Sequence, residues 1–228
     1  MRLILIGCEY AGTTTLAENF VAWAEKTMGA FVNVPAPYKI HDHFKLPDFS
    51  HPPEFSETEY RQIMDLSPRL KEVIQRHNVF YHIPRAGSGG DSVMIGLHYE
   101  DKIYGPLYFD YLQNLAPDDP IMQTRNAFED MILDGTPESV LILVKASPDT
   151  IANRMRDCPH HRQVIQEHDI AHILSRFEDE FVRSKLPNKL VIDTTHHTVE
   201  KSVEELVKGL GPFFTEEDKQ RLDSHKQA

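Results

Sequence analysis

A glycine-bearing loop follows the first apolar run of the chain. Gly7 and Gly12 are separated by four residues, after the run Leu3 to Ile6 and before a stretch of helical period. In a strand, loop and helix of this kind, backbone N–H groups can turn inward and form an anion nest at the helix N-terminus. A turn whose glycines serve only geometry is the alternative. The spacing favours a phosphate-binding loop, with cofactor contacts from Gly7, Ala11, Gly12, Thr13, Thr14 and Thr15.

The loop departs from the usual phosphate-binding pattern at one position. In the full pattern a lysine follows the second glycine and reaches the β- and γ-phosphates, and a serine or threonine then binds Mg²⁺. Here Thr13 stands at the lysine position and Thr14 at the Mg²⁺ position. A threonine donates one neutral hydrogen bond and supplies no positive charge to a transferred phosphoryl group. We therefore expect nucleotide affinity to survive better than the rate of transfer.

Three arginines could supply the missing charge. Arg154, Arg156 and Arg162 follow an apolar strand and a helical turn. A guanidinium placed beside phosphate groups would stabilise the charge of the transition state. Surface salt bridges with Glu167 and Asp169 are the competing interpretation.

Acidic residues follow a later apolar run. If Val93 to Leu97 is a buried strand, His98, Glu100 and Asp101 emerge near its carboxyl end. Carboxylates in such a position could act as acid or base or hold a metal ion. A register shift of one residue exchanges the faces of the two acids. A solvated turn is the alternative.

Two further segments could bind the acceptor. Asp42 and His43 lie in a segment rich in Pro, His and Asp, Tyr38 to Pro53, which reads as a long loop. We assign them to acceptor recognition, with turns or a metal site that includes His41 as alternatives. Arg85 could hold an anionic group of the substrate, or be an ordinary surface arginine.

Apolar runs of strand length alternate with longer stretches of helical period, which predicts an α/β fold with a parallel sheet wrapped by helices. The predicted strands are Arg2 to Ile6, Ala30 to Val34, Val93 to Leu97, Glu138 to Val144 and Lys189 to Ile192. The predicted helices are Thr14 to Met28, two within Ser56 to His77 that are broken before Pro68, one opened by Pro148, Arg162 to Ser184, and Val199 to Leu210.

Composition excludes several classes of protein. The chain has 228 residues, 40% of them apolar, which is enough for one sizeable core. Its net charge of −11 argues against an extended nucleic-acid surface. The first apolar run is too short for a membrane span, and Cys8 and Cys158 form no disulfide framework, so we expect a cytoplasmic protein without membrane contact. Zinc at the Cys and His residues of 158–168 is disfavoured by their irregular spacing.

Several segments together resemble the P-loop nucleoside and nucleotide kinases, of which thymidylate kinase is an example. They are the loop GCEYAGTTT, the region VLILVKASPDTIANRM with the arginines after it, and LVIDTTHHTVEKSVEELV. The resemblance implies a three-layer α/β/α sandwich, ATP phosphates and Mg²⁺ at the first loop, and an acceptor pocket above the carboxyl ends of the strands. It also implies one domain over 1–228, with an acceptor-binding insert at about 38–90, a lid at about 152–168 and a solvated tail at 212–228.

The resemblance further implies roles for side chains at the strand ends and in the lid. In these kinases, acids at the end of the strand next to the phosphate loop act on the acceptor or hold Mg²⁺, which makes Glu100 the candidate base, Asp101 the candidate Mg²⁺ ligand and His98 a substrate contact. Lid arginines close over the phosphates, so the candidate catalytic arginines are Arg154, Arg156 and Arg162.

The leading hypothesis is phosphoryl transfer from a nucleoside triphosphate to a small nucleoside, nucleotide or similar acceptor, in a monomer or a homodimer. One alternative is a sulfotransferase, because AGTTTL resembles the phosphosulfate-binding loop of those enzymes and LVKASPD loosely resembles a segment near their 3′-phosphate site. Those enzymes normally carry a lysine just before Gly-Thr-Thr, where this chain has Ala11. A non-catalytic nucleotide-binding protein is the other alternative.

Overall fold

The computed structural model describes residues 1–29, 39–40, 56–83, 91–116, 118–161 and 163–225. Its parallel strands form one sheet in the order β2-β3-β1-β4-β5. The strands are β1 (Arg2–Ile6), β2 (Lys39–Ile40), β3 (Ser92–Ile95), β4 (Val140–Lys145) and β5 (Asn188–Asp193). The helices are α1 (Thr13–Met28), α2 (Glu57–Met64), α3 (Pro68–His82), α4 (Leu97–Tyr108), α5 (Pro120–Gly135), α6 (Pro148–Asp157), α7 (Ile170–Arg183), α8 (Val199–Leu210) and α9 (Glu216–His225).

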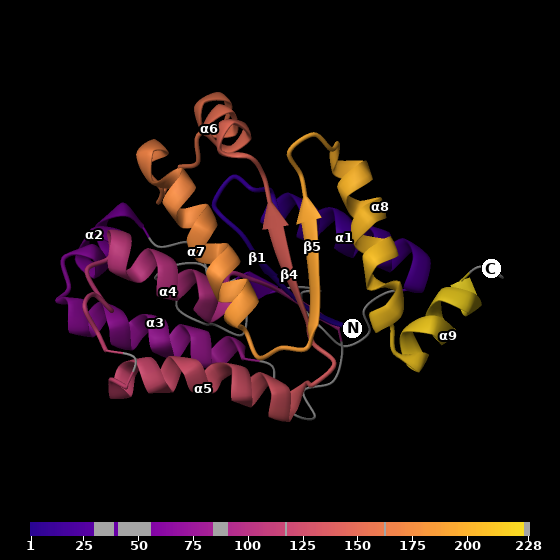
Figure 1. Ribbon diagram of the computed structural model, residues 1–228, viewed down its shortest axis with the longest axis horizontal. Helices are drawn as coiled ribbons and strands as arrows, with labels where there is room; N and C mark the ends of the chain where they lie inside the picture. Colours follow the sequence, from indigo (N-terminus) through magenta and orange to yellow (C-terminus); the bar gives the residue numbers. More distant parts are fainter. Residues whose placement is uncertain (30–38, 41–55, 84–90, 117, 162, 226–228) are drawn as a thin grey trace.

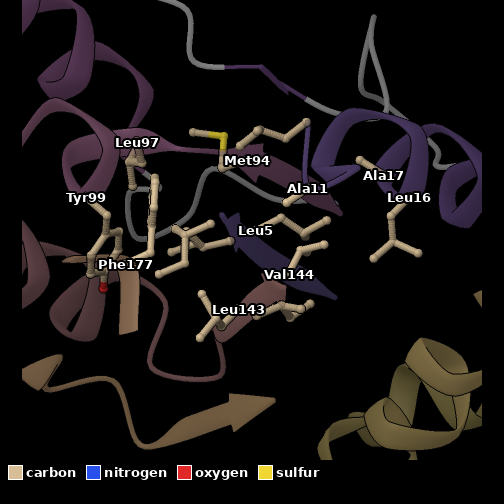
Figure 2. Packing of buried hydrophobic residues seen from close by; sticks show 14 of the residues in the cluster. Leu5, Ala11, Leu16, Ala17, Met94, Leu97, Tyr99, Leu143, Val144 and Phe177 are labelled. Carbon is tan, nitrogen blue, oxygen red and sulfur yellow. The ribbon is translucent and has the colours of Figure 1, made fainter. Parts of the chain in front are cut away.

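Helices cover both faces of the sheet. α1, α8 and α9 lie together on one side, and α3, α4, α5 and α7 lie on the other (Figure 1). The central strands β1 and β4 are buried almost throughout, which explains why both are unbroken apolar runs. Figure 2 shows Leu16 and Ala17 packed on one side of these strands and Tyr99 and Phe177 on the other. The predicted three-layer α/β/α architecture is confirmed.

Several predicted boundaries agree with the structure. The first strand and the helix Val199–Leu210 have the predicted bounds, and α6 opens at Pro148. α2 and α3 are separated before Pro68, as predicted. The predicted helix 162–184 was too long, because α7 begins only at Ile170 after a 3₁₀ turn. The predicted strand 30–34 lies outside the described residues.

The largest correction concerns the residues after β3. The strand ends at Ile95, and Gly96, with φ 76°, turns the chain directly into α4. His98, Glu100 and Asp101 are therefore helical residues and do not extend a strand. The sequence analysis also assigned no helix to α5, and it predicted a loop where β2 pairs with β3. The strand prediction failed because Leu97 continues the apolar run and masks the glycine turn.

The predicted solvated tail contains a helix, α9, which is exposed at most positions and attached to the fold at a few. α9 packs on α1, and the Asp218 side chain is buried. Arg221 on α9 donates to Asp91 at 2.7 Å and to the Met28 carbonyl at 3.3 Å. These contacts fix the helix to the base of the α1 layer. Within the part of the chain that the structure describes, no helix is long and apolar enough to cross a membrane.

A buried ion network joins three helices on the other face. Arg125 of α5 donates to Asp101 of α4 and to Glu72 of α3, at 2.7 Å in each case. The other Asp101 oxygen accepts from the Tyr111 hydroxyl at 2.6 Å. Burial alone would lower the pKa of Arg125, but the two carboxylates raise it above its usual value, so the guanidinium stays charged. The network makes α3, α4 and α5 one packed unit.

We predict that Asp101→Asn destabilises the fold by about 2 kcal/mol or more, because it removes one of the two carboxylates that pair with the buried Arg125 guanidinium. Urea unfolding measures this difference. The matched control is Asp130→Asn on α5, the helix that carries Arg125; it breaks an exposed ion pair with Lys185 and should cost less than about 1 kcal/mol. Equal, small effects of the two changes would contradict a structural role for Asp101.

Candidate phosphate-binding site

The loop between β1 and α1 has the backbone shape of an anion nest. A Cβ on Gly7 would lie 2.5 Å from the Val144 carbonyl oxygen, so only glycine permits this close approach to β4. The Ala11 N–H donates to the Cys8 carbonyl at 2.9 Å and closes the turn. Tyr10 and Gly12 both have positive φ, at 66° and 95°. Such alternation of left- and right-handed residues turns N–H groups toward one point.

The N-terminus of α1 is open toward that point. Gly12 is its N-cap and provides no side-chain cap, and the first turn carries no acidic residue. The first N–H groups of a helix have no partner within the helix, and the helix dipole places positive charge on them. Thr13 is half-buried, and Thr14 and Thr15 are exposed beside these N–H groups. The arrangement suits a phosphate group.

Arg154 of α6 brings a positive charge to the loop. Its Nη1 donates to the Tyr10 carbonyl at 3.0 Å and to the Thr194 hydroxyl at 3.1 Å, and its Nη2 donates to the Thr194 carbonyl at 2.8 Å. A Cβ on Gly12 would lie 3.8 Å from Nη1. Burial lowers the pKa of Arg154, but an arginine in a protein keeps its charge at neutral pH. The guanidinium thus lies beside Gly12, the residue before Thr13, which stands where the usual pattern has a lysine.

Thr194 links the loop to the ends of two other strands. Its hydroxyl donates to the Ala11 carbonyl at 2.8 Å and lies 3.1 Å from the Lys145 carbonyl. Its N–H also donates to Lys145, at 2.8 Å. The residue follows β5 directly and is almost fully buried. It therefore holds the carboxyl ends of β4 and β5 and the phosphate loop in one fixed arrangement.

The other predicted sources of charge lie elsewhere or are engaged. Arg156 is exposed and pairs with Glu167 at 2.7 Å, as the salt-bridge interpretation expects. Lys145 pairs with Glu178 at 2.5 Å, and Lys102 pairs with Glu180. The predicted site residues Arg162, Asp42, His43 and Arg85 lie outside the described residues.

The acids that follow β3 have different environments. Both oxygens of Asp101 are used by the buried network, so the structure gives no support to its predicted role as an Mg²⁺ ligand. Glu100 folds back over the turn, because a Cβ on Gly96 would lie 2.0 Å from its Oε2. Its charge contributes to raising the pKa of Cys8, which places the carboxylate near the loop. His98 is fully buried and packs against Tyr99.

No group of three or more His, Cys, Asp or Glu side chains within the described ranges is placed to hold a metal ion. Thr14, which is exposed on the first turn of α1, thus stays the candidate Mg²⁺ contact from the sequence.

The sequence analysis assigned no role to Glu9 and Tyr10, whose side chains both contact the segment after α6. We call the described part of that segment, residues 158–161 and 163–166, the strap. The sequence did contain one signal for Glu9, an acidic residue within a phosphate loop. Its charge opposes phosphate binding unless hydrogen-bond donors neutralise it, which indicates a structural partner.

Solved structures with the same fold were found, although no family profile and no curated protein matches the sequence. The YorR protein of Bacillus subtilis, solved in complex with phosphorylated GDP, has a TM-score of 0.57 and 14% identity, and the match covers 94% of this chain and 99% of YorR. Deoxyadenosine kinase from M. mycoides with bound dATP has a TM-score of 0.57 and 17% identity, with 92% and 99% covered. The chain has the P-loop kinase fold.

We predict that Arg154→Ala weakens the binding of tripolyphosphate about tenfold or more, because one charge-assisted contact is lost and the loop loses its anchor. Thermal shift with and without tripolyphosphate measures the change. Arg156→Ala removes the same charge from the exposed face of the same helix and should bind like the wild type. Equal weakening in both variants would show that only net charge matters.

We also predict that Cys8 and Cys158 differ in reactivity toward iodoacetamide. Burial, followed by the charge of Glu9, raises the pKa of the Cys8 thiol, whereas Cys158 is exposed. Thiolate is the nucleophile, so native Cys8 should react more than about 100-fold more slowly. Mass spectrometry of the alkylated peptides measures the two rates. Similar rates in the native protein, rather than only after unfolding, would contradict the buried position of Cys8.

Proposed function

We propose that this chain, which has the P-loop kinase fold, transfers a phosphoryl group from ATP or another nucleoside triphosphate to a small acceptor. The observation that carries the proposal is the guanidinium of Arg154 beside Gly12, at the open N-terminus of α1. Phosphoryl transfer needs positive charge where the transferred group develops its own charge. Arg154 supplies at the loop a charge that Thr13 cannot supply.

The donor phosphates would bind to the N–H groups of the loop and of the first helical turn. Thr13 would donate its hydroxyl, and Thr14 would contact Mg²⁺, the ion that neutralises charge on the phosphates. Arg154 is held by three hydrogen bonds to protein oxygens, so it is oriented before a nucleotide binds. Such preorganisation avoids a reorganisation cost during the reaction.

On the acceptor side we propose Glu100 as the base. It lies in the first turn of α4, directly after the carboxyl end of β3, and β3 is the neighbour of the strand that leads into the phosphate loop. In open α/β sheets, ligands bind outside the carboxyl ends of the strands. Asp42, His43, Arg85 and Arg162 stay proposals for contacts with the acceptor and the lid.

Two buried polar atoms on α3 are compatible with a polar acceptor. Glu72 Oε2 and Gln75 Nε2 have no hydrogen-bond partner within the described residues, although both side chains are buried. They are three residues apart and so share a helix face. A buried unpaired acceptor and donor favour a ligand that offers one of each, such as a nucleobase edge.

A non-catalytic nucleotide-binding protein is the second candidate, and Thr13 is the observation that favours it. Sulfate transfer from a phosphosulfate donor stays the third outcome of the same assay. The cytoplasmic location, which two free cysteines support, and the homodimer also remain proposals.

The proposal is tested by following ADP formation from Mg-ATP with a panel of nucleosides, nucleotides and other small alcohols. We predict that Thr13→Lys raises turnover by about tenfold or more, because its charge acts mainly on the transition state, and raises ATP affinity by less. Thr15→Lys places the same charge two residues further along α1 and should give no such gain.

The kinase proposal is contradicted if the wild type and Thr13→Lys both bind ATP and neither forms ADP with any acceptor. That result would leave the binding protein as the function of the site. Equal gains from Thr13→Lys and Thr15→Lys would show a general electrostatic effect on binding and would reject the transition-state argument.

A further inference from the structure

Glu9, inside the phosphate loop, uses its whole carboxylate to hold the strap. Its Oε2 accepts from the backbone N–H groups of Val164 at 3.0 Å and Ile165 at 3.1 Å. Its Oε1 lies 2.9 Å from Nδ1 of His160, which donates to an ionised carboxylate. The Glu9 side chain is only 15% exposed, and Ile165 is fully buried. The loop and the strap are therefore joined through a shielded carboxylate.

Tyr10, the next residue, adds a second set of contacts to the strap. Its hydroxyl accepts from the His160 N–H at 2.8 Å and donates to Gln163 Oε1 at 2.9 Å. Burial raises the pKa of the Tyr10 phenol, so this donor proton is retained. The Tyr10 and His160 rings stack with their centroids 4.0 Å apart. Glu9 and Tyr10 therefore act on the same few strap residues.

The backbone of Tyr10 needs this support. A φ of 66° is unfavourable for a tyrosine, and such a conformation persists only where surrounding contacts fix it. The same residue offers its carbonyl to Arg154 and helps to shape the nest of N–H groups. The strap contacts of the Glu9 and Tyr10 side chains therefore influence the backbone conformation with which the loop faces an anion.

We propose that Glu9 is a positioning residue, which fastens the strap to the phosphate loop and thereby keeps Tyr10, Gly12 and the open N-terminus of α1 in the arrangement that faces the donor phosphates. The effect on phosphate binding rests on the proposed function, whereas the fastening itself does not. A carboxylate in this loop would otherwise repel phosphate groups. The N–H groups of Val164 and Ile165 and the His160 ring donate to the carboxylate and offset its charge. Glu9 therefore stabilises the loop, although an acidic residue is otherwise unfavourable there.

Two variants separate the contact from the charge. Glu9→Ala and Glu9→Gln both remove the negative charge, but glutamine keeps a side-chain oxygen that can accept from Val164 and Ile165. We expect hydrogen exchange of these two amides to be about tenfold or more faster in Glu9→Ala than in Glu9→Gln. Glu167→Ala, which removes an acid next to the strap without loop contacts, is the control and should leave the two amides unchanged.

Binding of tripolyphosphate and of Mg-ATP tests the positioning role. Glu9→Ala should bind either probe about tenfold more weakly than Glu9→Gln, although their charges are equal. Equal exchange rates in Glu9→Ala and the wild type would overturn the fastening, and equal affinities of the two variants would overturn the positioning. If the wild type binds neither probe, the proposed function fails, while the exchange rates still decide the fastening. Should Glu9→Ala not fold, Glu9→Asp replaces it and is compared with the wild type, whose charge it keeps, because its shorter side chain cannot reach both amides.

Discussion

The site depends on one interaction, the guanidinium of Arg154 held between the phosphate loop and the end of β5. Its hydrogen bonds to Tyr10 and Thr194 join elements that are 144 and 40 residues away from it in the chain. Neutral oxygens accept its hydrogen bonds, and among the described residues no carboxylate forms an ion pair with it. A lysine in the loop would reach the phosphates from its own helix, whereas here the charge arrives from α6. We propose that this half-buried arginine compensates for the absent lysine.

The rest of the fold keeps these groups in register. β1 and β4 pair along Leu3 to Ile6, so the loop after β1 and the α6 segment after β4 emerge at the same edge of the sheet. Thr194 adds the end of β5 to that edge. On the face of the sheet opposite α1, the Arg125 network fixes α3, α4 and α5 relative to one another. The sheet positions the loop and the ends of the strands. Arg154 and Arg125 add specific polar contacts that apolar packing alone does not specify.

Local patterns in the sequence predicted the elements that depend on local physics. A few neighbouring residues are enough to recognise the apolar run of β1, the phosphate loop between its glycines and the amphipathic stripe of α8. α4 was missed because its strand-like start at Leu97 hides the turn at Gly96, and because Pro106 inside it reads as a helix breaker.

Long-range pairings could not be derived from the sequence. Asp101 looked like a metal ligand because its partner Arg125 is 24 residues away on a helix that was not assigned. The acidic side chain of Glu9 in a phosphate loop was a signal, but its partners could not be identified, because they lie about 150 residues further along the chain. The sequence predicted that arginines after β4 supply charge, but it could not distinguish between them. Only the fold shows that Arg154 lies at the loop and Arg156 on the surface.

The most direct test of the account is a crystal structure with Mg²⁺ and a non-hydrolysable ATP analogue. We expect the β-phosphate on the N–H groups of the loop and of the first turn of α1, with the Arg154 guanidinium within hydrogen-bond distance of a phosphate oxygen. A triphosphate bound at this loop without any contact to Arg154, or bound elsewhere on the molecule, would contradict the claim that this arginine takes over the charge of the absent lysine.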